Sequence, residues 1–158
     1  VTMMHETGCD GVVIGRGCLG RPWLFGHLHE VFAGRAAPAS PTLGEVAAVM
    51  VEHARLLWDH HPGDMGIRDF RKHAGWYLTG YPVGGELRRR FGMVSSLAEL
   101  DDLVALLDHG ALLVPGGERI VRGHSNGPIR VALPDGYLAN LDDETPPDDA
   151  AVVAVSGG

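Results

Sequence analysis

The residues best suited to bind a ligand form a glycine-rich turn close to the amino terminus, Gly15-Arg16-Gly17. The two glycines leave backbone N–H groups uncovered by side chains, and the Arg16 guanidinium can bind a phosphate through two parallel hydrogen bonds. A short apolar run, 11–14, precedes the turn, and a proline-containing segment, 20–23, follows it. This order predicts a buried strand, a phosphate-binding turn and a helix start. The alternative is that the glycines serve only a tight turn and Arg16 is a surface residue.

A second group of residues suited to binding is positively charged. Between positions 68 and 90 the chain carries six positive and two negative residues, a net charge of +4 before histidine is counted. The positive residues are Arg68, Arg71, Lys72, Arg88, Arg89 and Arg90. The first three share one side of a helix by their i, i+3 and i+4 spacing, and such a row can follow an RNA phosphate backbone. A solvated charged face over an aromatic core is the open alternative.

Other reactive side chains do not form a recognisable site. The nine histidines are scattered without a metal-binding pattern, and we expect no metal. Cys9 and Cys18 lie nine positions apart, a spacing typical of neither a disulfide framework nor a zinc site. No nucleophile is paired with a base, so we expect both cysteines to be structural or incidental.

Composition predicts a globular protein with an uneven charge. The 158 residues are 45% hydrophobic, enough for one core, or for a core fragment plus a small second domain. The net charge is −7, yet every charged residue from Val131 onward is negative, so an acidic tail masks a basic middle. No apolar run reaches the length of a membrane span, and we expect a cytoplasmic protein. The chain begins with Val1, so its start is either processed or, as we expect, truncated.

The elements that must position these residues are predicted from periodicity and stop signals. A helix over 2–6 ends at Gly8, the strand covers 11–14, and a helix started by Pro22 runs to Phe32. Prolines 38 and 41 indicate a linker over 36–41.

Four helices joined by short turns then predict a bundle. The first begins at Thr42 with a capping box to Glu45, the second ends at Gly80, the third covers 84–91, and the fourth runs from Ser96 to near Gly110. Helical spacing also predicts the apolar faces of three of these helices. The face of the first is Val46, Val49, Met50, His53, Leu56 and Leu57; that of the second is Ile67, Phe70, Ala74, Tyr77 and Leu78; and that of the fourth is Leu100, Leu103, Val104 and Leu107. After Gly110 the periodicity fails, and 111–158 reads as an irregular acidic extension with apolar islands at 131–134 and 152–155.

Two motifs in order resemble one family. The run 8–25 resembles the end of the barrel in bacterial tRNA-dihydrouridine synthases, and 71–73 with 76–81 and Leu87-Arg88 resembles their helical domain. The resemblance covers about 1–110. It implies that 1–35 is the last strand and helix of a flavin-binding TIM barrel, that 42–110 is an all-α tRNA-binding domain, and that 36–41 links them.

The resemblance also implies an activity. Members of this family use FMN and electrons from NADPH to reduce the C5–C6 double bond of uridine in tRNA. Gly15, Arg16 and Gly17 would hold the FMN phosphate, whereas the family's catalytic cysteine lies upstream of the residues matched here. We therefore expect the full-length protein to be a monomeric synthase and the 158-residue chain to be inactive alone, because one strand cannot form a barrel interior.

Two other functions stay open. One is an RNA-binding helical module without catalysis. The other is a flavin-dependent TIM-barrel reductase acting on a small molecule, such as dihydroorotate or enoate reductases, whose barrels also end in a glycine-arginine turn. A basic helical domain after the barrel favours the tRNA enzyme over the small-molecule reductases.

Overall fold

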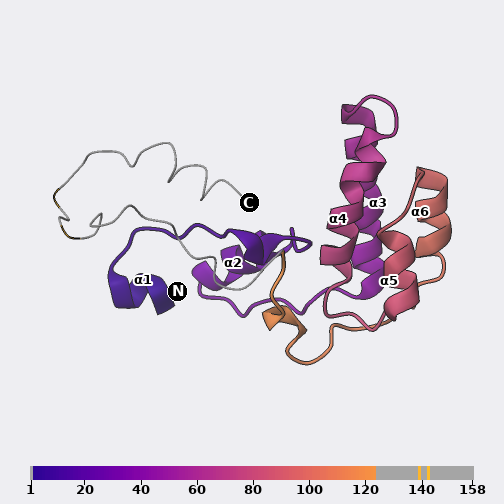
Figure 1. Ribbon diagram of the computed structural model, residues 1–158. Helices are drawn as coiled ribbons and strands as arrows, with labels where there is room; N and C mark the ends of the chain where they lie inside the picture. The colour runs from indigo at the N-terminus through magenta and orange to yellow at the C-terminus, as the bar shows by residue number, and fades with distance from the viewer. Residues whose placement is uncertain (1, 124–138, 140–141, 143–158) are drawn as a thin grey trace. The chain divides into compact units, whose positions relative to one another are not determined.

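The computed structural model describes residues 2–123, 139 and 142 (Figure 1). Residues Val1–Gly123 form one compact unit, separate from His124–Gly158. The helices are α1 (Thr2–Thr7), α2 (Leu24–Phe32), α3 (Leu43–His60), α4 (Met65–Leu78), α5 (Gly85–Phe91) and α6 (Leu97–Val104), with 3₁₀ turns η1 (Arg16–Cys18) and η2 (Gly117–Arg119). The predicted apolar islands at 131–134 and 152–155 lie outside the described residues.

Helices α3 to α6 form the predicted bundle. Helices α3 and α4 lie side by side, α6 packs on α3, and α5 packs on α4 and α6 (Figure 1). The capping box at Thr42 is formed: its hydroxyl accepts from the Glu45 amide, and the Glu45 carboxylate accepts from the Thr42 amide. Close contact between α3 and α4 requires Gly66, because a Cβ there would lie 2.3 Å from the Leu57 carbonyl oxygen.

The predicted apolar faces supply most of the core. All five residues predicted on α4 are buried, and so are Val46, Met50, Leu100, Leu103 and Leu107. Leu56 differs, because it is 58% exposed. The fourth helix also ends earlier than predicted, at Val104, since Leu106 and Leu107 donate to carbonyls three residues back and tighten the last turn.

The predicted buried strand at 11–14 is wrong for the described residues. No strand occurs in the part of the chain that the structure describes, and Val13 is fully exposed. A strand needs a neighbour to pair its N–H and C=O groups, and no second strand occurs among the described residues to pair with 11–14. The helix after Pro22 also begins two residues later, at Leu24, because Leu24 first closes a turn onto the Arg21 carbonyl.

Helices α1 and α2 bury none of their residues within the described part of the chain. Apolar side chains on or beside them are exposed, namely Met3, Val12, Val13, Phe25 and Phe32. None of the helices among the described residues is both long and apolar enough to span a bilayer.

The turn before α2 is anchored on the bundle by close backbone contact. Gly20 has a φ of +64°, and a Cβ there would lie 2.3 Å from the Trp76 carbonyl carbon. Any other residue at position 20 would therefore collide with the end of α4 and adopt a strained backbone. Near this contact the Tyr81 hydroxyl donates to the Pro41 carbonyl at 2.6 Å, which ties the segment before α3 to the end of α4.

Candidate functional site

The Gly15-Arg16-Gly17 turn is exposed and held by its own backbone. The Cys18 amide donates to the Gly15 carbonyl at 3.3 Å and the Leu19 amide to the Arg16 carbonyl at 3.1 Å, which forms η1. A Cβ at Gly15 would meet nothing within 4 Å, and one at Gly17 would meet only Ile14, at 3.7 Å. Packing among the described residues therefore does not require glycine at either position.

A cavity of about 300 Å³ opens beside this turn. One wall is Arg16, Gly17 and Arg21, and the other is the segment 118–122, which begins within η2. The lining carries four guanidinium groups, from Arg16, Arg21, Arg119 and Arg122, and one carboxylate, from Glu118. We name this cavity the arginine pocket.

Sequence reasoning missed the second wall of the arginine pocket because it assigned 111–158 to an irregular acidic extension. The signal that could have found it is local: Arg119 and Arg122 lie between Gly116-Gly117 and Gly123, before the stretch after Val131 in which every charged residue is acidic. Gly123 has a φ of +84°, and a Cβ there would lie 3.1 Å from Arg16 Cδ. The glycine thus lets the segment approach the Arg16 side chain closely.

Arg122 is the most deeply buried charged residue of the pocket. It is 6% exposed, and its Nη1 and Nη2 atoms each donate at 3.2 Å, to the carbonyls of Ile120 and Thr79. Its buried Nε atom has no hydrogen-bond partner in the structure. Burial, and next the nearby Arg21 charge, lower the pKa of the Arg122 guanidinium.

Arg21 fixes the second wall against the first. Its Nη1 atom donates to the Glu118 carbonyl at 3.0 Å, across 97 residues of sequence. Among the described residues, neither Arg21 nor Arg122 forms a salt bridge with a carboxylate. The arginine pocket is therefore a positively charged hollow whose buried cation is paired only with carbonyl oxygens.

The six basic residues predicted to bind RNA lie on α4 and α5 but are not equivalent. Arg71 Nε donates to the Val94 carbonyl at 2.8 Å, and Arg88 Nη2 donates to the Tyr81 carbonyl. Both side chains are half-buried, and burial lowers the pKa of Arg88. These two arginines hold the loops after α4 and α5 in place.

The other four basic residues are exposed. Three of them pair with acids on their own helix or at its start: Arg68 with Asp64 at 3.8 Å, Lys72 with Asp69 at 3.8 Å, and Arg89 with Glu86 at 2.8 Å. No ion pair is found for Arg90 within the described residues.

The charge of Arg90 nevertheless reaches the start of α6. Hydrogen bonds from Ser95 are the main cause that lowers the pKa of the Glu99 carboxyl, and the Arg90 and Arg71 charges lower it further. The structure thus brings Arg71 of α4 and Arg90 of α5 close to Glu99.

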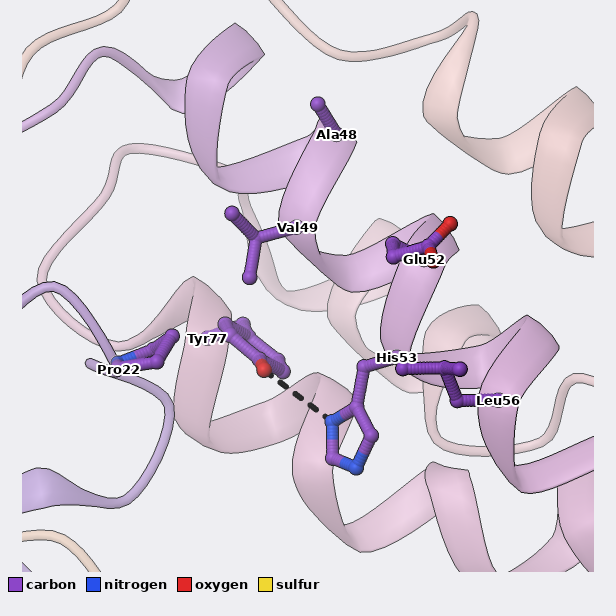
Figure 2. A pocket seen from close by; sticks show the side chains of 7 residues that line it. All are labelled: Pro22, Ala48, Val49, Glu52, His53, Leu56 and Tyr77. Atoms are coloured by element: carbon purple, nitrogen blue, oxygen red, sulfur yellow. Dashed lines mark hydrogen bonds between the residues drawn. The ribbon is translucent and has the colours of Figure 1, made fainter. Parts of the chain in front are cut away.

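A second hollow, of about 450 Å³, lies between α3, α4 and the turn before α2 (Figure 2). It is mostly apolar and is lined by Pro22, Ala48, Val49, Glu52, His53, Leu56 and Tyr77. His53 Nδ1 and the Tyr77 hydroxyl share a hydrogen bond of 3.1 Å, and the His53 and His73 ring centroids lie 4.7 Å apart.

Two of the histidines that seemed scattered in the sequence thus meet in the fold. Burial and, less strongly, the charges of His53 and Lys72 lower the pKa of His73 to about 4, so this ring is neutral at pH 7. In the part of the chain that the structure describes, no three His, Cys, Asp or Glu side chains gather as a metal site. Both cysteines are free thiols, and Cys18 Sγ contacts the Gly15 carbonyl at 3.0 Å.

Comparison with known proteins places this chain in one family. Residues 1–110 match the family model described as dihydrouridine synthase (Dus). Over all 158 residues the chain is 52% identical to a protein from Mycobacterium leprae named "Probable tRNA-dihydrouridine synthase", and it spans 41% of that protein. It is 43% identical over 90 residues to "tRNA-dihydrouridine synthase B" from Pseudomonas putida, of which it covers 26%. The matches run through both the glycine-arginine turn and the basic bundle, and the chain belongs to the dihydrouridine synthase family.

Proposed function

We propose that this chain is the carboxyl-terminal part of a tRNA-dihydrouridine synthase, and that it supplies the FMN-phosphate turn and a tRNA-binding helical surface. The proposal is supported by the family match over 1–110 and by the relatives' names. The chain spans about two fifths of the mycobacterial relatives' length, so the reaction belongs to a longer protein. The barrel fragment 1–35, the linker 36–41 and the helical domain 42–110 are part of the same proposal.

The residues of the turn fit a phosphate group. Gly15 and Gly17 have open space where a Cβ would be, so a ligand oxygen can approach the backbone there. Arg16 and Gly17 both line a cavity rich in guanidinium groups. This open, arginine-lined turn is the observation that carries the flavin assignment, because the described residues give no packing reason for its glycines.

When bound, FMN would supply the hydride, renewed by NADPH, that reduces the C5–C6 double bond of uridine. The task of this chain's own residues is then to hold the phosphate end of the cofactor. A guanidinium and backbone amides fix a phosphate by position as well as charge, which orients whatever is attached to it.

The helical surface fits RNA by its charge. Arg68, Lys72, Arg89 and Arg90 are exposed on two helices that pack together, and phosphate contacts by such residues supply sequence-independent affinity. The ion pairs of Arg68, Lys72 and Arg89 with nearby acids hold these three side chains in place without burying them. The surface therefore supports binding of the tRNA substrate rather than recognition of one base.

The flavin assignment is tested by comparing FMN with riboflavin, which lacks the phosphate. We expect the 158-residue chain to bind FMN more tightly than riboflavin by flavin fluorescence titration, and Arg16→Met to weaken FMN binding about tenfold, the cost of losing charge-assisted hydrogen bonds. Arg55→Met, an exposed arginine of α3, is the matched control. Equal affinity for the two flavins, or an Arg16→Met affinity equal to that of the control, would refute the assignment.

A further inference from the structure

The arginine pocket extends beyond the part of the chain that defines the family. The family match ends at residue 110, yet five of the eight lining residues lie at 118–122. Similarity to the mycobacterial relatives continues over all 158 residues, so those proteins share this segment. The segment after the bundle therefore forms one wall of this cavity.

The charges in the pocket are arranged at a cost to the free protein. The lining includes the carboxylate of Glu118, which pairs with Arg119 at 3.5 Å, and among the described residues neither Arg21 nor Arg122 pairs with a carboxylate. Arg122 is a buried cation near the Arg21 cation, and burial of a charged group is expensive unless an opposite charge or full hydrogen bonding offsets it. Two hydrogen bonds to backbone carbonyls use the Nη1 and Nη2 donors of Arg122, and its Nε donor has no hydrogen-bond partner.

An anion in the pocket would offset that cost. A phosphate group has several acceptor oxygens, so it can take hydrogen bonds from more than one planar guanidinium at once. Lysine would supply a point charge only, and all four cations here are arginine.

We propose that Arg119 and Arg122 of the 117–123 segment, with Arg21, complete a phosphate-binding pocket whose other wall is the Gly15-Arg16-Gly17 turn. The proposal deepens the proposed function and rests on it for a phosphate at that turn. The phosphate has two possible sources, the cofactor and the RNA backbone, which share the same chemistry. The segment after the bundle is then part of the binding site rather than a passive extension.

The test uses inorganic phosphate as the probe, titrated calorimetrically into the 158-residue chain at constant ionic strength. We expect binding to the unsubstituted chain and a loss of at least about tenfold in affinity for Arg122→Gln, since charge-assisted hydrogen bonds to the anion are removed. Arg119 has an 89% exposed side chain, so Arg119→Gln should leave the fold intact and weaken phosphate binding about two- to fivefold. Arg55→Gln is the control and should bind like the unsubstituted chain.

If Arg122→Gln does not fold, as judged by circular dichroism, Arg119→Gln still decides the proposal. Phosphate affinities equal to the control for every folded variant, or no binding by the unsubstituted chain, would overturn it. A parallel titration with FMN and riboflavin separates the two proposals. Phosphate binding that needs Arg119 and Arg122, together with equal affinity for both flavins, supports the pocket and removes the flavin assignment.

The source of the phosphate is resolved by the same variants. If Arg119→Gln weakens FMN binding but leaves riboflavin binding unchanged, the pocket holds the cofactor phosphate. If it weakens tRNA binding and leaves FMN binding unchanged, the pocket holds an RNA phosphate. Either result supports a phosphate site completed by the 117–123 segment.

Discussion

At the scale of single residues, arginines that look alike in the sequence have different roles in the fold. Arg71 and Arg88 donate to backbone carbonyls and hold loops, whereas Arg68 and Arg89 pair with carboxylates at the surface. Arg122 is buried with one donor unpartnered. Replacing Arg71 or Arg88 would therefore confound a binding test, because a carbonyl left without its donor also destabilises the bundle.

A second residue-scale consequence concerns His73 and pH. Because the folded-state pKa of His73 is lowered to about 4, the unfolded chain takes up a proton near pH 6.5 while the folded chain does not. The contribution of neutral His73 to the free energy of unfolding is complete above pH 6.5, and it is lost as the pH falls from 6.5 to 4. We expect His73→Gln to reduce the difference in urea midpoint between pH 7 and pH 4.5.

The control for this prediction is His29→Gln, which replaces an exposed histidine of α2. It should keep the pH dependence of the unsubstituted chain. The groups near His73 are His53, Lys72 and Asp69, and His53 is also half-buried with a lowered pKa. If His73→Gln and the unsubstituted chain lose stability in parallel from pH 7 to 4.5, His73 does not carry the effect.

At the scale of elements, α4 and α5 present the basic surface and η2 presents the second wall of the arginine pocket. A glycine positions two of these elements: Gly66 lets α4 pack closely against the Leu57 carbonyl of α3, and the left-handed Gly116 precedes η2. The Thr79 carbonyl after α4 accepts from Arg122, so the end of α4 also supports the pocket. The basic bundle and the pocket are therefore joined through one helix end.

The prediction at this scale is that the exposed cations of α5 contribute to tRNA binding. We expect Arg89→Glu with Arg90→Glu to weaken tRNA binding and to reduce the slope of log affinity against log salt by about 0.7–0.9 for each phosphate that the protein no longer neutralises. Filter binding or fluorescence anisotropy over a salt series measures both quantities. Arg88 is left unchanged because its bond to the Tyr81 carbonyl is structural.

The matched control is Arg55→Glu on α3, which reverses an exposed charge outside the predicted surface. It should keep most of the salt dependence, after allowance for the change in net charge. A second control, Arg55→Glu with Arg35→Glu, has the same total charge change as the α5 double variant. If these two variants bind tRNA with equal affinities and equal salt slopes, α5 is not part of the tRNA interface.

At the scale of the whole molecule, the described unit holds one core, in the bundle. The core residues lie at 43–111, while α1 and α2 have no buried residue. Phe25 and Phe32 of α2 are exposed, and so is Val13 in the segment between the two helices. The chain covers 41% of its Mycobacterium leprae relative, and an exposed apolar surface of this kind is typical of an interface with further protein. The barrel part of the proposed enzyme would cover that surface.

This arrangement predicts that the 158-residue chain has no dihydrouridine synthase activity alone. The described residues form no strand, and a barrel interior requires layers of side chains from many strands. Purified chain incubated with FMN, NADPH and unmodified tRNA should yield no dihydrouridine by mass spectrometry of the digested tRNA. The full-length Mycobacterium leprae relative is the comparison, and dihydrouridine formed by the 158-residue chain itself would contradict the prediction.

The sequence by itself determined the helices of the bundle and most of their buried faces. Capping at Thr42 and Ser96, the apolar spacing of α4 and the glycine stops are local signals, and local signals fix where helices begin and end. The sequence also pointed to the turn at Gly15-Arg16-Gly17, whose residue types indicate phosphate chemistry wherever the turn lies.

Only the tertiary structure decided what surrounds those residues. It showed that 11–13 is exposed and that no strand among the described residues pairs with 11–14. It also showed that His53 meets His73, and that Arg21 and Arg122 line one cavity across about a hundred residues of sequence. Periodicity describes one element at a time, whereas strand pairing, ring contacts and a shared pocket depend on long-range packing. The arginine pocket belongs to this second kind, because its two walls come from opposite ends of the described unit.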